Sequence, residues 1–258
     1  MPKIEMIVSD LDRTLLRTDR TISEYTKTVF KKCREAGLLL VFATARPERA
    51  TKNWQLDCQP SYVIANNGAT IVKDGKTIRN VCISEATKHS IIKRFVSEKS
   101  IAGICAEVGD FLYTNGTDYT GWDVDNGWNP VYNDYHAPVS ESVCKFSVEC
   151  RNANIVAGIL RDYPELHMFP NNGEPWFQLT HKSTSKFEAV IYLSTLTGIP
   201  LQNIIAFGDD YNDTEMLEKC GIGVAVQNAA PEIKAAANHI CDTNDNDGVA
   251  QYLEEFSL

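Results

Sequence analysis

The chain has 258 residues, of which 43% are hydrophobic and 23% charged, as in globular proteins with a sizeable buried core. Its formal net charge of −9 argues against recognition of nucleic acid or of an anionic membrane, both of which usually rely on a basic face. No apolar run reaches transmembrane length, and Pro2, Lys3 and Glu5 interrupt any N-terminal leader. We therefore expect a soluble cytoplasmic protein, a monomer or homodimer, with neither nucleic acid nor membrane as partner.

The eight cysteines are scattered along the chain and form no CxxC pair, so their spacing predicts neither a zinc site nor a thioredoxin-like motif. Reduced thiols agree with a cytoplasmic location. We expect each cysteine to serve as a small buried hydrophobic residue. The cysteines are Cys33, Cys58, Cys82, Cys105, Cys144, Cys150, Cys220 and Cys241.

The N-terminal part of the chain alternates between strand and helix patterns. Residues 21–37 have apolar side chains at helical spacing and predict a helix. Thr21 and Glu24 fit a capping box, and Gly37 suits the C-terminal cap. Residues 38–45 are apolar on both faces, as a central parallel strand should be. The other predicted elements here are strands at 3–10 and 62–65 and a weaker helix at 48–56.

The same alternation returns in the C-terminal part. Gly198 can end one helix, and Pro231 suits the first turn of another. Alternating strands and helices predict an α/β fold, a parallel sheet with helices on both faces. The predicted helices are 185–198, 213–221 and 231–237, and the predicted strands are 203–210 and 223–227.

The middle of the chain follows a different pattern, in which helices are separated by hairpins. Gly109 and Asp110 suit a two-residue turn in the first hairpin. This order predicts an antiparallel sheet with helices on one side, inserted into the α/β core. We expect residues 1–82 and 184–258 to form the core and residues 83–183 to form the insert. Its predicted elements are helices at 85–98 and 154–163, hairpins at 104–114 and 166–180, and a strand at 145–150.

Two carboxylates follow the first predicted strand. Asp10 and Asp12 are two residues apart, so in an extended segment their side chains point the same way. Ligands of open α/β sheets bind beyond the carboxyl ends of strands. Carboxylates this close repel each other unless a cation lies between them, and a hard divalent cation prefers oxygen ligands. The alternative is that both residues merely form a turn, as aspartate often does.

A second acidic cluster, GDDYND at 208–213, also follows a predicted strand. Asp209, Asp210, Asn212 and Asp213 supply four oxygen-bearing side chains within five positions. One alternative is a loop in which Asn212 or Asp213 caps the next helix. Because both acidic clusters lie at strand ends, a shared metal ion is the interpretation that we favour.

Two further residues are suited to binding phosphate. Thr44 ends the strand at 38–45 and places a hydroxyl at a strand-to-helix turn, where backbone N–H groups favour anions. Lys186 lies in the first turn of its predicted helix, where a cation opposes the helix dipole. It is either a solvated surface charge or the cation that neutralises a carboxylate and a phosphate.

Taken together, DLDRT at 10–14, FATAR at 42–46, Lys186 and GDDYND at 208–213 resemble the motifs of the haloacid dehalogenase (HAD) superfamily of phosphohydrolases. The order is most similar to the Cof-type sugar-phosphatase branch, subfamily IIB, which carries a large α+β cap between its second and third motifs. IANNGATI at 64–71 and the segment 224–240 agree with it. The resemblance implies a Rossmann-like, HAD-like core with an inserted cap that determines substrate specificity.

The resemblance also implies roles for individual residues. Asp10 would be the nucleophile that forms an aspartyl phosphate, and Asp12 the general acid and base. Thr44 and Lys186 would hold the phosphoryl oxygens. A magnesium ion would be bound by Asp10, Asp12 (through its backbone carbonyl) and Asp209, with support from Asp213. The remaining residues implied for substrate binding are Ala45, Arg46, Asn67, Gly68 and Asn212, the last as a residue that orients Lys186 or a water.

The chain departs from the family pattern at three positions. Arg13 and Ala45 stand where the family usually or often has glycine, and Phe187 replaces a common glycine after the motif lysine. None of these changes removes a catalytic group. Arg13 either crowds its loop or adds positive charge near the substrate.

The sequence thus predicts a magnesium-dependent phosphatase for a small phosphorylated metabolite, with a sugar phosphate favoured. A phosphomutase or phosphotransferase that uses the same intermediate, and a non-catalytic phosphate-binding regulator, are the alternatives. Residues 116–142 are expected to form a loop or short helix. Aromatic and polar residues of the insert are candidates for substrate contact or for core: Tyr119, Trp122, Asp123, Asp125, Asn126, Trp128, Tyr132, Tyr135 and Trp176.

Overall fold

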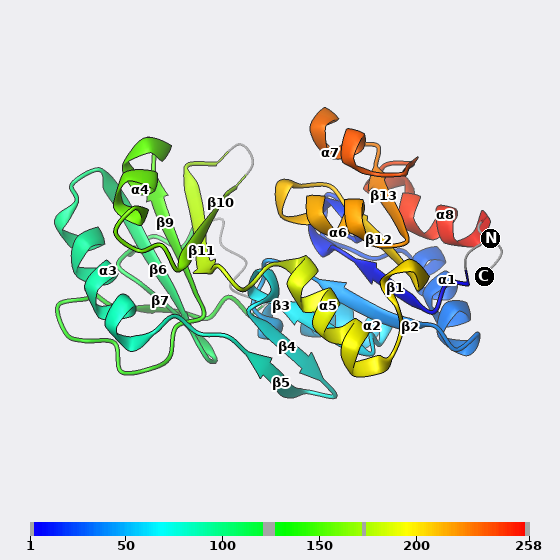
Figure 1. The fold of residues 1–258 in the computed structure, drawn as a ribbon, viewed down its shortest axis with the longest axis horizontal. Coiled ribbons are helices and arrows are strands. Elements are labelled where there is room, and N and C mark those ends of the chain that lie inside the picture. The colour runs from blue at the N-terminus through cyan, green and yellow to red at the C-terminus, as the bar shows by residue number, and fades with distance from the viewer. Residues whose placement is uncertain (1–2, 121–126, 172–173, 256–258) are drawn as a thin grey trace. The chain divides into compact units, whose positions relative to one another are not determined.

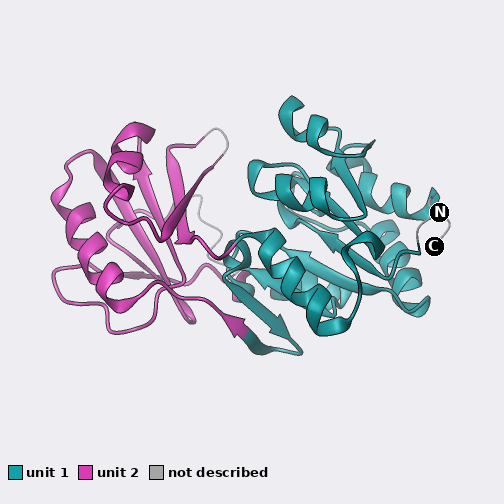
Figure 2. Ribbon diagram, in the orientation of Figure 1, with its two compact units in different colours: residues 1–48, 52–78, 185–258 teal, residues 49–51, 79–184 magenta. Residues whose placement is uncertain are grey.

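The computed structural model describes residues 3–120, 127–171 and 174–255. The chain divides into two compact units (Figure 2). Unit 1 comprises residues 1–48, 52–78 and 185–258, and unit 2 comprises residues 49–51 and 79–184. No helix among the described residues is long and apolar enough to cross a membrane. The predicted candidates at 122, 123, 125 and 126 lie outside the described residues.

Unit 1 is built around one eight-stranded sheet (Figure 1). Its strand order is β14-β13-β12-β1-β2-β3-β4-β5. The six strands from β14 to β3 run parallel, and β4 pairs antiparallel with β3. The predicted α/β class is therefore confirmed. The strands are β1 (Met6–Ser9), β2 (Leu39–Ala43), β3 (Tyr62–Ala65), β4 (Thr70–Lys73), β5 (Lys76–Asn80), β12 (Ile204–Gly208), β13 (Ile222–Val226) and β14 (His239–Cys241).

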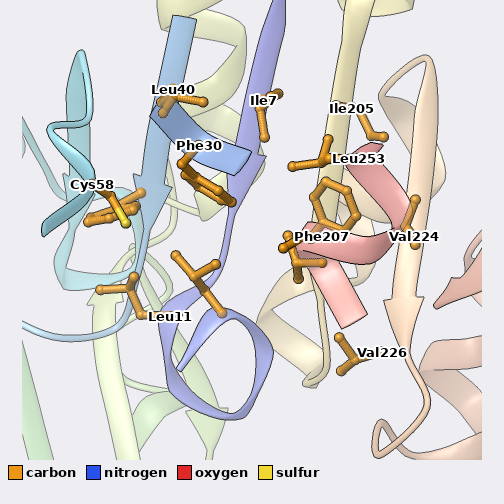
Figure 3. Close-up of a cluster of buried hydrophobic side chains, with 14 of the residues drawn as sticks. Ile7, Leu11, Phe30, Leu40, Cys58, Ile205, Phe207, Val224, Val226 and Leu253 are labelled. Carbon is orange, nitrogen blue, oxygen red and sulfur yellow. The ribbon is translucent and has the colours of Figure 1, made fainter. Parts of the chain in front are cut away.

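The central strands bury both faces because they are apolar throughout. Ile7 of β1 and Phe207 of β12 belong to one core cluster (Figure 3), whereas their neighbours Met6 and Ala206 belong to another on the opposite face. Helices cover both faces. The helical elements are α1 (Glu24–Glu35), α2 (Lys52–Cys58), α5 (Lys186–Thr197), α6 (Thr214–Lys219), α7 (Pro231–Ala236) and α8 (Gly248–Glu255), with 3-10 turns at Glu48–Thr51, Asn66–Gly68, Leu201–Asn203, Tyr211–Asp213 and Asn244–Asn246, and an irregular π-type turn at Leu11–Leu15.

The register of the sheet aligns three of the strand ends. Ser9 pairs with Phe207 of β12 and with Phe42 of β2. The chain leaves β1 toward β2 through α1, which packs in the first cluster. It leaves β12 toward β13 through α6, which supplies Met216 to the other cluster, as does Cys220 just after the helix. The connections thus diverge on opposite faces at β1 and β12, which is the switch point where ligands bind in open α/β sheets.

Unit 2 contains a six-stranded sheet of order β10-β11-β9-β6-β7-β8, antiparallel except for the parallel pair β7 and β8. Both of its helices contribute to one core cluster, together with alternate residues of β6, β9 and β11, so they pack on the same face. The elements are α3 (Glu85–Ser97), β6 (Ile101–Val108), β7 (Phe111–Thr114), β8 (Pro130–Tyr132), β9 (Lys145–Cys150), α4 (Ala153–Leu160), β10 (Leu166–Pro170) and β11 (Trp176–His181).

Local predictions were confirmed at several element ends. Val108 pairs with Phe111, which leaves Gly109 and Asp110 as the two-residue turn. Gly198 ends α5 in the left-handed conformation, with φ 73°. Gly37 follows the end of α1 with φ 86°, as a helix-ending glycine should.

Other local predictions were wrong. The N-terminal cap of α1 is Ser23, whose side chain accepts the N–H of Thr26, and not Thr21. The Thr21 hydroxyl donates to Asp19, because the chain is still in a turn there. Residues 130–132 form the short strand β8, although only a loop or helix was expected in that stretch.

Candidate active site

The centre of the candidate site is a buried lysine between two carboxylates. Lys186 Nζ lies 2.6 Å from Asp10 Oδ1 and 2.7 Å from Asp213 Oδ1. Asp10 follows β1 directly, and its N–H donates to Phe207 O of the neighbouring strand β12. Lys186 is the first residue of α5, whose N-terminal cap is Ser185. Exposure is only 1% for Lys186 and 5% for Asp10, so the surface-charge alternative for Lys186 is wrong.

Asp209 extends this cluster from the end of β12. The Thr14 hydroxyl donates to Asp209 Oδ1 at 2.8 Å, and both residues are buried. Arg13 Nε lies 4.0 Å from Asp209 Oδ2, and the Arg13 side chain is largely exposed. Sequence reasoning missed Thr14, although it lies within the motif DLDRT.

Asp213 is held by the backbone of its own loop. Its Oδ2 accepts the N–H groups of Asp209 and Asp210, which leaves Oδ1 to bind Lys186. Gly208 makes this possible, since a Cβ at that position would lie 2.4 Å from the Asp213 Cβ. Asp213 stands at the N-cap position of α6, as considered, but makes no side-chain cap bond to that helix. Its side chain instead forms a capping box with Asp210, whose side chain caps the turn Tyr211–Asp213. The acidic cluster therefore serves both the loop and the site.

The electrostatics of the cluster are unusual. Burial raises the pKa of Asp10 well above its ordinary 3.8, although the Lys186 charge opposes this rise. Burial, with the charge of Asp213, raises the pKa of Asp209 to about 7. Burial alone would lower the pKa of Lys186, but the charges of Asp10 and Asp213 outweigh it and raise that pKa. Several acids surround one lysine, so Lys186 stays protonated, while Asp10 and Asp209 bind protons more readily than exposed carboxylates do.

This donor set fits a hard divalent cation. Asp10, Asp209 and Asp213 each offer a carboxylate oxygen within 4.8 Å of the others. Oxygen ligands and a net negative charge are what magnesium or a similar ion requires. A cation bound here would also lower the pKa values of Asp10 and Asp209, which burial raises.

Asp12 is paired with Arg46 and does not belong to the group of three buried carboxylates. Its Oδ1 and Oδ2 accept bonds of 2.7 Å each from the two-pronged guanidinium of Arg46, and its side chain is 42% exposed. Arg46 itself is buried and stacks over the Trp54 ring at 4.9 Å from the ring centroid. The family resemblance implied only a substrate-binding role for Arg46, and no sequence pattern indicated its contact with Trp54.

A neighbouring set of predicted residues surrounds the ends of β2 and β3. Thr44 is fully buried and its hydroxyl accepts the N–H of Arg46. Asn67 accepts a bond from the Asn212 side chain, whose own Oδ1 is buried with no hydrogen-bond partner among the described residues. Gly68 adopts φ +91° beside the carbonyl of Ser185. The structure thus brings Gly68 next to the start of α5. Ala45, the remaining predicted residue of this set, is half-buried.

Comparison with known proteins agrees with this arrangement. The sequence model of the haloacid dehalogenase-like hydrolases matches residues 7–253. The chain belongs to the haloacid dehalogenase-like hydrolases. This confirms the predicted family, and the enzyme is a phosphatase of that family.

Relatives within this family carry different substrate names. The Bacillus subtilis 5-amino-6-(5-phospho-D-ribitylamino)uracil phosphatase YitU is 28% identical, with 97% of each chain covered. The Escherichia coli pyridoxal phosphate phosphatase YbhA is 25% identical and covers 96% of this chain and 97% of its own. The solved structure of the HAD subclass IIB sugar phosphatase BT4131 has a TM-score of 0.85 at 19% identity, with 98% and 99% of the two chains covered. At this low identity, the similarity to BT4131 concerns the fold alone.

The structure explains one departure of this HAD-like hydrolase from its family. Arg13 stands where glycine is usual, and its backbone adopts φ 61°, the left-handed region that glycine enters without cost. The Arg13 carbonyl accepts a bond from Asn228, which helps to hold this turn. Arg13 thus occupies a conformation typical of glycine and adds a positive charge near Asp209.

Proposed function

We propose that this enzyme is a magnesium-dependent phosphatase that hydrolyses a small phosphorylated metabolite through an aspartyl phosphate on Asp10. The observation that carries the proposal is the buried contact of Asp10 with Lys186, beside two further carboxylates that suit a divalent cation. Carboxylates are established nucleophiles in phosphoryl transfer. The family membership supports the reaction class.

In this proposal Asp10 attacks phosphorus, and the leaving oxygen departs on the opposite side. Lys186 balances negative charge on the transferring group, which is the largest demand in phosphoryl transfer. The Thr44 hydroxyl accepts the Arg46 N–H and keeps its own proton to donate to a phosphoryl oxygen. Magnesium, when bound by Asp10, Asp209 and Asp213 with the Asp12 carbonyl, would supply further charge neutralisation.

Asp12 serves as the general acid and base in this scheme. The two side-chain oxygens of Asp12 accept bonds from Arg46. In the proposed sequence Asp12 first gives a proton to the leaving oxygen and then takes one from the water that attacks the intermediate. Arg46 thereby acts on the reaction by positioning Asp12.

Unit 2, which we assign as the cap, selects the leaving group. On the sheet face that its helices leave open, the register pairs Glu107 with Lys145 and Lys145 with Thr180. All three are buried, and Glu107 Oε1 and Thr180 Oγ1 lack hydrogen-bond partners among the described residues. A row of carboxylate, ammonium and hydroxyl groups suits a hydroxyl-rich leaving group, which favours a sugar phosphate.

The aromatic candidates divide between core and surface. Tyr135 is buried in the core of unit 2, where its hydroxyl donates to Tyr113 O. Tyr132 is 56% exposed. The Trp128 ring lies beside Lys145, with the ammonium 5.9 Å from its centroid. Among these, we propose Trp128 as the residue that accompanies Lys145 in substrate selection.

A substrate screen tests the function. The wild-type protein should release phosphate from a generic aryl phosphate only with magnesium, and activity that persists in excess chelator would contradict the metal assignment. A panel of phosphorylated metabolites, scored by kcat/KM, should favour sugar phosphates. Lys145→Met should change the ranking of that panel while the aryl phosphate rate stays within a few-fold. Phosphate appearing on an added sugar rather than in water would indicate a phosphotransferase.

A further inference from the structure

Two cysteines of unit 2 lie side by side although 62 positions separate them in the sequence. Cys82 Sγ is 3.0 Å from Cys144 Sγ. Ile83 N donates to Val143 O at 2.9 Å, and this bond together with the sulfur contact places residues 82 and 144 opposite each other on adjacent backbone segments. Directly opposed side chains are the closest cross-strand neighbours, so the two sulfurs meet without a shift of the backbone.

The surroundings of the pair distinguish its two members. Asn80 Nδ2 donates to Cys82 Sγ at 3.3 Å, and Asn80 Oδ1 lies 3.1 Å from Cys144 Sγ, whose single proton can be donated either to this oxygen or to Cys82. Cys144 is buried, whereas Cys82 is partly exposed. The bond from Cys144 lowers the pKa of Cys82 to about 7, with Lys88 assisting and burial and Glu85 opposing. Cys82, which is the more exposed of the two and has a lowered pKa, is therefore the member suited to react as the thiolate.

Five other cysteines of the chain have raised rather than lowered pKa values. Burial raises the pKa of Cys33, and it raises those of Cys58, Cys105, Cys220 and Cys241 to about 12. Because the thiolate is the reactive form, these residues are inert toward mild oxidants. The expectation that every cysteine is a buried hydrophobic residue thus does not hold for Cys82.

We propose that Cys82 and Cys144 form a redox modification site, which a hydroperoxide oxidises to an intramolecular disulfide. The Cys82 thiolate attacks the O–O bond, so an S–O bond forms, the O–O bond breaks and hydroxide leaves. Cys144 then attacks the sulfenic sulfur, the S–S bond forms and the S–O bond breaks with loss of a second hydroxide, which is released as water. Two thiols and one hydrogen peroxide thereby give one disulfide and two waters.

The position of the pair in the chain gives the modification a consequence. The chain passes from unit 1 to unit 2 between residues 78 and 79, and Cys82 follows that crossing closely. Cys144 directly precedes β9, a strand inside the unit 2 sheet. The disulfide would tie the crossing segment to that sheet and close a long loop, which constrains the unfolded chain. We expect oxidation to raise Tm by several degrees.

The test uses the full-length wild-type protein and hydrogen peroxide, followed by alkylation of remaining thiols and peptide mass spectrometry. A linked peptide pair containing Cys82 and Cys144 should appear, disappear on treatment with dithiothreitol, and form more than about tenfold faster than any oxidation of Cys220. Cys220→Ser is the matched control and should keep the link. In Cys144→Ser, Cys82 should accumulate as a sulfenic acid that dimedone captures.

Three outcomes would overturn the proposal. Both thiols could remain alkylatable while buried cysteines or methionines are oxidised. Cys82 could proceed to sulfinic acid while Cys144 stays reduced in the wild type. Cys82 could instead link two chains, which non-reducing electrophoresis would reveal. Because the wild-type measurement needs no substitution, a variant that fails to fold does not affect the test.

Discussion

Lys186→Met removes the positive charge from the centre of the site while keeping a side chain of similar length. Lys186 is 1% exposed and contacts Asp10 and Asp213 at 2.6 and 2.7 Å. Removing one member of a buried ion pair costs about 3–5 kcal/mol, because the partner charges stay buried without compensation. For a chain of this size, that corresponds to a fall in Tm of roughly 6–20 °C.

Urea denaturation of the metal-free protein measures this cost above pH 7. The penalty should shrink at lower pH, where the buried acids take up protons and need less compensation. Lys219→Met is the matched control, because Lys219 pairs with Glu215 at 2.9 Å but both side chains are 49% exposed. Exposed pairs contribute less than about 1 kcal/mol. If Lys186→Met were as stable as Lys219→Met, the reasoning on the buried cluster would be refuted.

Three further predictions concern the same site. Gly68→Ala should destabilise the fold by more than about 4 kcal/mol in urea melts, because a Cβ would lie 2.0 Å from the Ser185 carbonyl oxygen. The control Gly75→Ala, at φ +71° but with open space around it, should cost only about 1 kcal/mol. Equal costs for the two variants would contradict the close approach at Gly68. Thr14→Val removes the hydroxyl that donates to Asp209, so it should lower the free energy of unfolding by about 1–3 kcal/mol and raise the Asp209 pKa. Carboxylate NMR titration can follow this pKa, and an unchanged titration would count against the contact. Because the folded-state pKa of Asp209 is raised from 3.8 to about 7, Asp209 should contribute a loss of up to about 1.4 kcal/mol of stability per pH unit as pH rises through that window in the metal-free protein, beside the contribution of Asp10, whose pKa is also raised. Asp209→Asn should remove the Asp209 part of this slope, and a variant with the wild-type slope would assign the effect to other groups.

The sheet and the convergence of its acidic residues could be predicted because they depend on local patterns. Residues 38–45 and 203–210 are apolar on both faces and end in polar residues, and parallel strands bring such ends to one edge. Asp10 and Asp209 meet there because Ser9 pairs with Phe207. Nothing more than strand order was needed to place these carboxylates near each other.

Other contacts could not be predicted because they depend on packing between distant segments. The two hydrogen bonds from Arg46 to Asp12 require the turn after β2 to face the turn after β1. That arrangement depends on side-chain geometry, which the periodicity of the sequence does not reveal. The cap of α1 shifted from Thr21 to Ser23 because a local Asp19 bond competed for Thr21. Cys82 and Cys144 show no motif, since only the tertiary fold brings them together.

Chemical trapping of the intermediate tests the central proposal most directly. The wild-type enzyme is mixed with magnesium and an active phosphorylated substrate, quenched in acid, and treated with borohydride, which reduces an acyl phosphate to an alcohol. Peptide mass spectrometry should find homoserine at position 10, dependent on substrate and absent from Asp10→Asn. Turnover with no reduction at Asp10, or reduction at Asp209 or Asp213 instead, would contradict the assignment of Asp10 as the nucleophile.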